Sequence, residues 1–330
     1  MPEAISKAAT QVAAGRQGAG KANALYFLLF VAALLGAPYL IYPVFLMKAL
    51  CFAVFACAYN LLLGYGGMLS FGHALFFGSA AYVSAHAAKE WGLSAELCIL
   101  IGTAYAAALG VVAGWLAIRR HGIYFAMITL ALAQMMYFFY LQAPFTHGED
   151  GIQGVPRNDL FGVVPIGENL SFYYLVLAIF VGAFLLIYRI VHSPFGQVVK
   201  MICENEQRAI SLGYRIEQYK LLTFVLSAGL AGLAGATKAL VFNIASLTDV
   251  FWAMSGEVVL MTLIGGLGTI FGPVVGAAFV VGLQDYLADY GSLVTIIQGV
   301  VFIACVLVFR RGIVGELSHR LRKKDSEPGS

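Results

Sequence analysis

Residues 191–220 read VHSPFGQVVKMICENEQRAISLGYRIEQYK. They form a long polar segment, rich in Lys and Arg, between two apolar runs. Ser193, which precedes a proline, is typical of a helix start, because the hydroxyl can cap the helix and proline fits its first position. Gly213 is typical of a helix end. The pattern predicts one short helix between them, with Glu204 and Arg208 on one face and an apolar side that rests on protein or membrane. Such a helix suits docking, and a solvated helix without a partner is the alternative.

The composition decides the class of protein. The 330 residues are 61% hydrophobic and 11% charged, with a mean hydropathy of +0.85, whereas a soluble domain carries about 25% charged residues. Apolar runs of roughly 20 residues recur along the chain, and each is long enough to cross a hydrocarbon core. We therefore expect an all-α, polytopic helical membrane protein. A β-barrel would instead need alternating segments of about ten residues.

About ten membrane segments are predicted, at residues 24–42, 44–63, 69–88, 94–118, 122–141, 171–190, 221–242, 256–270, 272–289 and 293–309. With both termini in the cytoplasm, most Lys and Arg residues fall on the cytoplasmic side, as the positive-inside rule requires. The exceptions are Lys48, Lys89, Arg157 and Lys238.

The expected domains follow from these segments. A disordered cytoplasmic tail (1–23) precedes the permease domain (24–310), and a basic cytoplasmic tail (311–330) follows it. Residues 192–220 form the cytoplasmic docking segment. Residues 142–170 form a periplasmic loop, which either receives a substrate-delivering partner or is an ordinary mobile loop.

Two glycine-rich breaks lie at membrane depth, at Gly64–His73 and Gly265–Pro273. Backbone freed by glycine or proline is tolerated there only inside protein or beside a water-filled cavity, which is typical of transporters. The second break is either a tight turn between two spans or the tip of a re-entrant pair. The groups expected to line a substrate pathway are Tyr65, Gly67, Ser70, His73, Tyr124 and Thr129, and packing within the bundle is the alternative for each.

Enzymatic and metal-binding patterns are absent from the sequence. The six histidines never pair four residues apart, and the five cysteines show no CxxC spacing, so we expect no metal site and no catalytic residues. Residues 15–22 approach a phosphate-binding loop but end in Ala22, where Ser or Thr would hold magnesium. Nothing suggests nucleic acid as a partner.

Four ordered blocks resemble the LivM-type permease of branched-chain amino acid ABC importers: LLGYGGMLSFGHALFFGSAAY (62–82), GIYFAMITLALAQM (122–135), ENEQRAISLGYRIEQYKLLTFVLSAGLAGLAGA (204–236) and GGLGTIFGPVVGA (265–277). The resemblance implies a multi-pass protein of the bacterial inner membrane, embedded in lipid. It also implies a LivH-like second permease, two cytoplasmic ABC ATPases that bind the ATP, and a periplasmic solute-binding protein.

The same resemblance assigns the coupling of the permease to the ATPase to Glu204, Asn205, Arg208, Ala209, Leu212 and Gly213. Met68 and Phe71 depart from the residues that the family often has at these positions, so the substrate does not follow by analogy. An importer of urea or a short amide remains open, as does an identical copy in place of the second permease. A self-sufficient secondary carrier is disfavoured because no clear acid or histidine lies near the midplane.

Overall fold

The structure is a computed structural model that describes residues 30–159, 167–288, 293–308 and 312–316. The expected tail 1–23 and most of the tail 311–330 lie outside these residues. The helices are Phe30–Tyr39, α2 (Pro43–Asn60), α3 (His73–Lys89), α4 (Ala95–Ala117), α5 (Ile123–Gln142), α6 (Asn169–His192), α7 (Pro194–Glu204), α8 (Glu206–Ser211), α9 (Ile216–Phe242), α10 (Trp252–Gly265), α11 (Gly272–Leu287) and α12 (Leu293–Val308). Two-residue strands β1 (Ile152–Gln153) and β2 (Ile244–Ala245) pair antiparallel.

The all-α membrane class is confirmed at this level. Within the described residues, five helical stretches are long and apolar enough to cross a membrane: Pro43–Tyr65, α4, α5, α6 and α9. α3 has 17 residues, α10 has 14 and α11 has 16, against the roughly 20 that a perpendicular span needs. The expected segment 69–88 is wrong at its start, because the helix begins only at His73.

The centre of the bundle is formed by α2 and α9. In their most apolar stretches 83% and 72% of the residues are buried, whereas in α5 only 28% are buried. Small residues allow the close approach of α9 to its neighbours. A Cβ on Gly110 of α4 would lie 2.7 Å from Ala228, and one on Gly235 would overlap the carbonyl of Phe77. Glycine at these two positions therefore lets α9 pack closely against α4 and α3.

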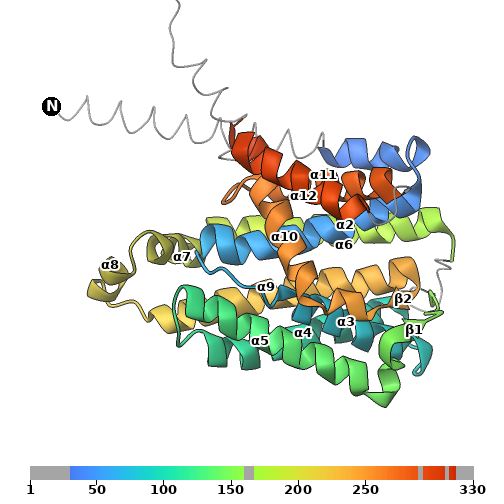
Figure 1. The fold of residues 1–330 in the computed structure, drawn as a ribbon, viewed down its shortest axis with the longest axis horizontal. Helices are drawn as coiled ribbons and strands as arrows, with labels where there is room; N and C mark the ends of the chain where they lie inside the picture. Colours follow the sequence, from blue (N-terminus) through green and yellow to red (C-terminus); the bar gives the residue numbers. More distant parts are fainter. Residues whose placement is uncertain (1–29, 160–166, 289–292, 309–311, 317–330) are drawn as a thin grey trace, which may run out of the picture.

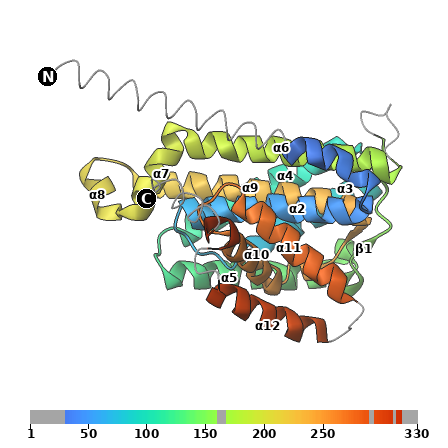
Figure 2. The same cartoon turned by 90° about the horizontal axis from the view of Figure 1, so that it is seen from above.

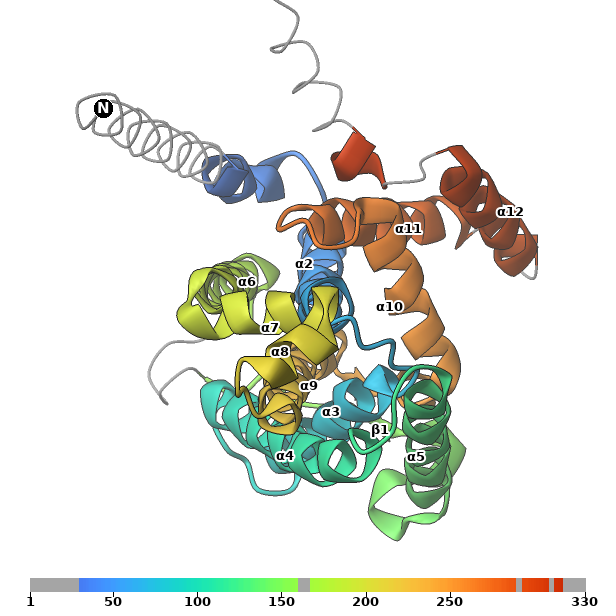
Figure 3. The ribbon, with the colours of Figure 1, turned by 90° about the vertical axis from the view of Figure 1, so that its left-hand side faces the viewer.

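The bundle has two different ends (Figure 1). α7 and α8 project at one end, which we call the α8 end; it comprises residues 118–122 and 192–216. The strands lie at the other, which we call the strand end; it comprises residues 88–94, 143–158 and 240–250. Figure 2 shows the same separation from above, with α12 along one side of the bundle. Figure 3 looks onto α7 and α8 and shows α5 and α10 standing apart from α6.

Candidate functional site

The first glycine break follows the end of α2. The helix finishes in a π-helical turn, Leu61–Tyr65, and the chain then runs without regular structure to the start of α3. We call residues 66–72 the broken segment. Gly67 has φ +65°, which favours glycine, and a Cβ on Gly64 would meet the Asn60 side chain and the Gly268 amide. The start of the break is thus packed closely against the second break.

His73 anchors the broken segment through a directed chain of hydrogen bonds. Ser227 Oγ donates to the Ala58 carbonyl (2.6 Å), so it can only accept from His73 Nε2 (2.8 Å). The imidazole proton is therefore on Nε2, and Nδ1 accepts from Ser70 Oγ (3.3 Å). Ser70 Oγ in turn accepts from the Gly72 amide (3.2 Å). Every donor in this series of hydrogen bonds has an acceptor when His73 is neutral. The histidine therefore joins the broken segment to α9.

Further side chains hold the broken segment from other helices. Tyr59 of α2 donates its hydroxyl to the Ser70 carbonyl (3.0 Å), and the Phe71 amide donates to Thr129 Oγ1 of α5 (3.2 Å). Ser255 of α10 accepts from the Ala74 amide (2.8 Å) at the first turn of α3. These bonds replace the helical ones that the break removes, so the irregular backbone is satisfied inside the bundle.

Asn60 joins the two glycine breaks. Its Nδ2 donates to the Thr269 carbonyl (2.8 Å), and its Oδ1 accepts from the Gly268 amide (3.0 Å). The side chain is 3% exposed. Gly268 has φ +70°, so the turn between α10 and α11 adopts a conformation that presents both backbone groups to one amide. The end of α2, which leads into the first break, is therefore hydrogen-bonded directly to the second break.

The docking segment is two helices rather than the single predicted helix. Ser193 accepts from the Gly196 amide, which confirms it as the cap of α7, and Gly213 has φ +85°, as a helix end requires. Asn205 is extended, ends α7 and caps α8 by accepting from the Arg208 amide (3.0 Å). Glu204 and Arg208 therefore belong to different helices, and the expected shared face is wrong.

The apolar contacts of the docking segment also differ from expectation. Ala209, one of the residues assigned to coupling with the ATPase, is fully buried and packs inside the chain with Ile202 and Ile216, so it is not available to a partner. Leu212 is 60% exposed and Ile210 is 54% exposed. Glu204, Asn205, Arg208 and Gly213 are exposed. The apolar surface available to a partner thus includes Ile210 and Leu212, with Tyr214 beside them.

α7 and α9 touch the broken segment and the π turn directly. The Lys200 ammonium lies 5.1 Å from the ring centre of Tyr65, and a Cβ on Gly67 would lie 2.7 Å from the Cys203 sulfur. Lys220 at the start of α9 forms an ion pair with Glu206 of α8 (2.8 Å). The segment expected to meet the ATPase and the break expected to line the pathway are therefore neighbours.

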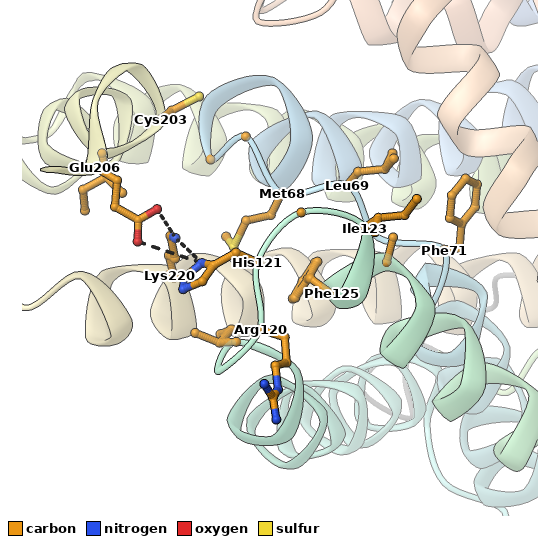
Figure 4. Close-up of a pocket in the computed structure, with 16 residues that line it drawn as sticks. Met68, Leu69, Phe71, Arg120, His121, Ile123, Phe125, Cys203, Glu206 and Lys220 are labelled. Atoms are coloured by element: carbon orange, nitrogen blue, oxygen red, sulfur yellow. Dashed lines mark hydrogen bonds and ion pairs between the residues drawn. The ribbon is translucent and has the colours of Figure 1, made fainter.

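A cavity of about 560 Å³ lies between them (Figure 4). One wall is polar and carries Glu206, Lys220 and His121, with His121 Nδ1 3.3 Å from Lys220 Nζ. The opposite wall is apolar and comes from the broken segment and the start of α5. Its side chains are Met68, Leu69, Phe71, Ile123, Phe125 and Ala126.

The expected pathway residues are not all brought together. Gly67 lines the cavity, and Tyr65 lies beside it against Lys200. Ser70, His73 and Thr129 are buried and hydrogen-bonded within the bundle, whereas Tyr124 is 68% exposed. Sequence reasoning missed Asn60 and Ser227. A polar side chain inside an apolar run was the available signal for both.

No group of three or more potential metal ligands occurs within the described residues. Residues 41–308 match the family of the branched-chain amino acid transport system permease component. The chain belongs to this family. The expected resemblance is confirmed, as is the expectation that the chain is a transport subunit and not an enzyme.

Relatives agree with the family. The chain is 25% identical over 288 residues to the high-affinity branched-chain amino acid transport system permease protein LivM of Escherichia coli, and 24% identical over 290 residues to LivM of Salmonella typhimurium. These matches cover 80% and 81% of this chain and 66% of each relative, slightly under two thirds of their length. A probable branched-chain amino acid transport permease protein LivH of Methanocaldococcus jannaschii is 28% identical over 152 residues, 43% of this chain and 46% of that protein. No solved structure matches. The alternatives of urea, an amide or a secondary carrier are not favoured.

Proposed function

We propose that this chain is a membrane subunit of an ATP-driven importer of branched-chain amino acids in the bacterial inner membrane. In this proposal it pairs with a LivH-like second permease, two cytoplasmic ATPases bind ATP, and a periplasmic binding protein delivers the substrate. The chain itself contributes one half of the pathway and requires no cofactor. The names of the two LivM relatives support the substrate class.

The single observation that carries the mechanism is the contact between the docking segment and the broken segment. Asn205 sets the angle between α7 and α8, Lys200 and Cys203 of α7 touch residues 65–67, and Lys220 ties α8 to α9. A displacement of α8 by an ATPase would reach the broken segment through these contacts and through His73, which joins it to Ser227 of α9. Asn60 would carry the change to the second break. In many other transporters such paired discontinuities form the substrate site, around which the two halves of the protein move.

We further propose that the α8 end is cytoplasmic and the strand end periplasmic. Arg119, Arg120, Lys200, Arg208, Arg215 and Lys220 lie at or beside the α8 end, whereas the strand end carries only Lys89 and Arg157 within the described residues. This distribution follows the positive-inside rule.

Cys203 offers a direct test of orientation. It is exposed, while Cys51, Cys57 and Cys98 are buried and Cys305 can be replaced by serine. Burial and the neighbouring Glu204 raise the pKa of the Cys203 thiol, partly offset by Lys220, so labelling with a membrane-impermeant maleimide is run above pH 8. Cys203 should be labelled in inside-out vesicles only. A cysteine at Asp150 in a cysteine-free background should give the opposite pattern, and labelling of both from one side would refute this topology.

Transport itself is tested with the complete set of co-encoded subunits in proteoliposomes. We expect uptake of leucine, isoleucine or valine that requires both ATP and the binding protein. Urea and acetamide should not be taken up. Uptake by this chain alone, driven by an ion gradient, would contradict the proposal.

A further inference from the structure

The polar wall of the cavity at the α8 end has hydrogen-bonding capacity that its internal contacts leave unused. An ammonium only donates, so His121 Nδ1 accepts from Lys220, and a neutral ring carries its proton on Nε2. Lys220 Nζ also donates to Glu206 Oε2 (2.8 Å), which leaves one of its three N–H groups for a further acceptor. Glu206 Oε1 is 3.9 Å from His121 Nδ1, too far for a hydrogen bond.

The unused groups are therefore of two opposite kinds. Glu206 Oε1 can accept from a cationic ammonium, while Lys220 Nζ and His121 Nε2 can donate to a carboxylate. The three side chains come from α8, the turn before α5 and the start of α9, and Lys220 contacts both of the others directly at one side of the cavity (Figure 4). Arg120 also lines the cavity and adds to its cationic side, so a carboxylate would have Lys220, His121 and Arg120 within the same lining while Glu206 is left for an ammonium. A zwitterion is matched by both kinds of group.

The opposite wall is apolar and would contact the uncharged part of the ligand. Met68, Phe125 and Ala126 are at most 9% exposed and form part of its apolar surface. The volume of about 560 Å³ falls within the range of roughly 300–1,000 Å³ for small-molecule sites. A small apolar side chain would rest on this wall while the ammonium and carboxylate meet the polar one.

We propose that this cavity binds a free α-amino acid with an aliphatic side chain from the cytoplasmic side, and that its occupation slows ATP hydrolysis by the importer. The inference rests on the proposed function for both the substrate class and the orientation. Lys220 already pairs with Glu206, and the ligand would add a second connection by contacting Glu206 of α8 together with His121 and Lys220, and so hold α8 more firmly against the bundle. Accumulated product would then restrain the helix that the ATPase must move.

Binding is measured on the complete transporter in nanodiscs without the binding protein, with radiolabelled L-leucine as the probe. We expect saturable binding that unlabelled leucine and valine displace. Glycine lacks the side chain, 4-methylpentanoate lacks the ammonium and 3-methylbutylamine lacks the carboxylate. Each should compete at least about tenfold more weakly, because each leaves one wall or one charged group without its partner.

The decisive variant is Glu206→Gln, which keeps the shape of the side chain and removes its charge. It should weaken leucine binding about tenfold or more and abolish the inhibition of ATP hydrolysis by leucine. Glu217→Gln is the matched control, since Glu217 is an exposed glutamate on the first turn of α9 that does not line the cavity. Ile123→Glu places an acid on the apolar wall at a position that is 72% exposed, and should weaken binding without disturbing the core.

Two outcomes overturn the inference: no saturable leucine binding, or binding that Glu206→Gln leaves unchanged because it occurs elsewhere in the pathway. Binding-protein-dependent uptake, measured on the same preparations, separates this result from the proposed function. Normal leucine uptake without cavity binding would refute the cavity and leave the importer intact. Absence of uptake of every branched-chain amino acid by a complex that hydrolyses ATP would refute the transported substrate.

Discussion

The two ends of the bundle are built on different principles. The strand end is closed by contacts within the chain. Arg157 donates to the Val241 and Leu240 carbonyls (2.6 and 3.1 Å) at the end of α9 and to Asn169 (2.8 Å), while Asn158 reaches two carbonyls of the α3–α4 turn. The loop 142–170 is thus anchored to the bundle at Arg157 and Asn158, while its docking of a partner or its mobility stays a prediction.

The α8 end has fewer such contacts. The ion pair of Glu206 and Lys220 is partly exposed, and exposed pairs contribute only about 0–1 kcal/mol. Ile210 and Leu212 face away from the chain, and the cavity separates α8 from the start of α5. The strand end is therefore stabilised by hydrogen bonds within the chain. The α8 end leaves exposed side chains that a partner protein could contact and displace. Substitutions at the two ends should consequently affect different quantities.

The largest loss of stability is expected at the strand end from Asp249→Ala. Asp249 is 2% exposed and accepts from Lys238 through both carboxylate oxygens (2.7 and 2.6 Å). Removing it leaves a poorly solvated ammonium, which costs about 3–5 kcal/mol. The free energy of unfolding in detergent, from denaturant titration, should fall by this amount. The double change Lys238→Met with Asp249→Leu should recover most of it.

Asp150→Ala is the control for this pair, because Asp150 is an exposed acid at the same end and its loss should change stability by less than about 0.5 kcal/mol. Equal stability of Asp249→Ala and Asp150→Ala would show that the strand end is not held by its buried ion pair.

A smaller loss is expected from Asn60→Ala at the junction of the two breaks. The change leaves the Gly268 amide and the Thr269 carbonyl without their partner; because Gly268 is exposed and Thr269 is half-buried, water can reach them and the total loss should be about 1–3 kcal/mol. Denaturant titration should show this loss together with reduced uptake. Gln142→Ala, at an exposed residue on the last turn of α5, should alter neither. Full uptake by Asn60→Ala would separate the two breaks functionally.

The sequence predicts the class of fold because apolar runs and glycine spacing are local features. It also predicts the two glycine-rich breaks. Gly64 and Gly265 allow neighbouring backbone to come closer than a side chain with a Cβ would permit. It does not predict the division of the docking segment, because Asn205 has no exceptional local pattern. Its extended conformation depends on the burial of Ile202 and Ala209 on either side of it.

The partners of the buried polar groups are also beyond the sequence. His73 was expected to face a pathway, yet its partner Ser227 lies 154 positions away. The sequence pattern points to Glu204 and not to Glu206. Glu206 becomes an ion-pair partner only because the start of α9 brings Lys220 next to it. Such pairings are set by the packing of α8 on α9, which sequence spacing does not encode.

A modest effect on stability with a larger effect on transport is expected from Ser227→Ala. The variant removes the acceptor of His73 Nε2, which costs about 1–3 kcal/mol if the imidazole N–H stays buried and unpaired. It also disconnects the broken segment from α9, so uptake per ATP hydrolysed should fall. Thr237→Val is the matched control on the same helix, because the Thr237 hydroxyl bonds only to the Leu233 carbonyl of its own helix. If both variants couple ATP to uptake normally, the histidine is only a packing element.

The smallest effect on stability and the most specific effect on assembly are expected from Leu212→Asp. Leu212 is 60% exposed, so the subunit alone should unfold within about 0.5 kcal/mol of the parent. If an ATPase buries this side chain in an apolar groove, a carboxylate there is desolvated without a partner and costs several kcal/mol of binding. The fraction of ATPase that co-purifies with the permease should therefore fall. Gln218→Asp introduces the same charge at an exposed position on the first turn of α9 and should retain the ATPase. Equal loss in both variants would indicate a general effect of negative charge at the α8 end, and full retention in both would place the ATPase contact elsewhere.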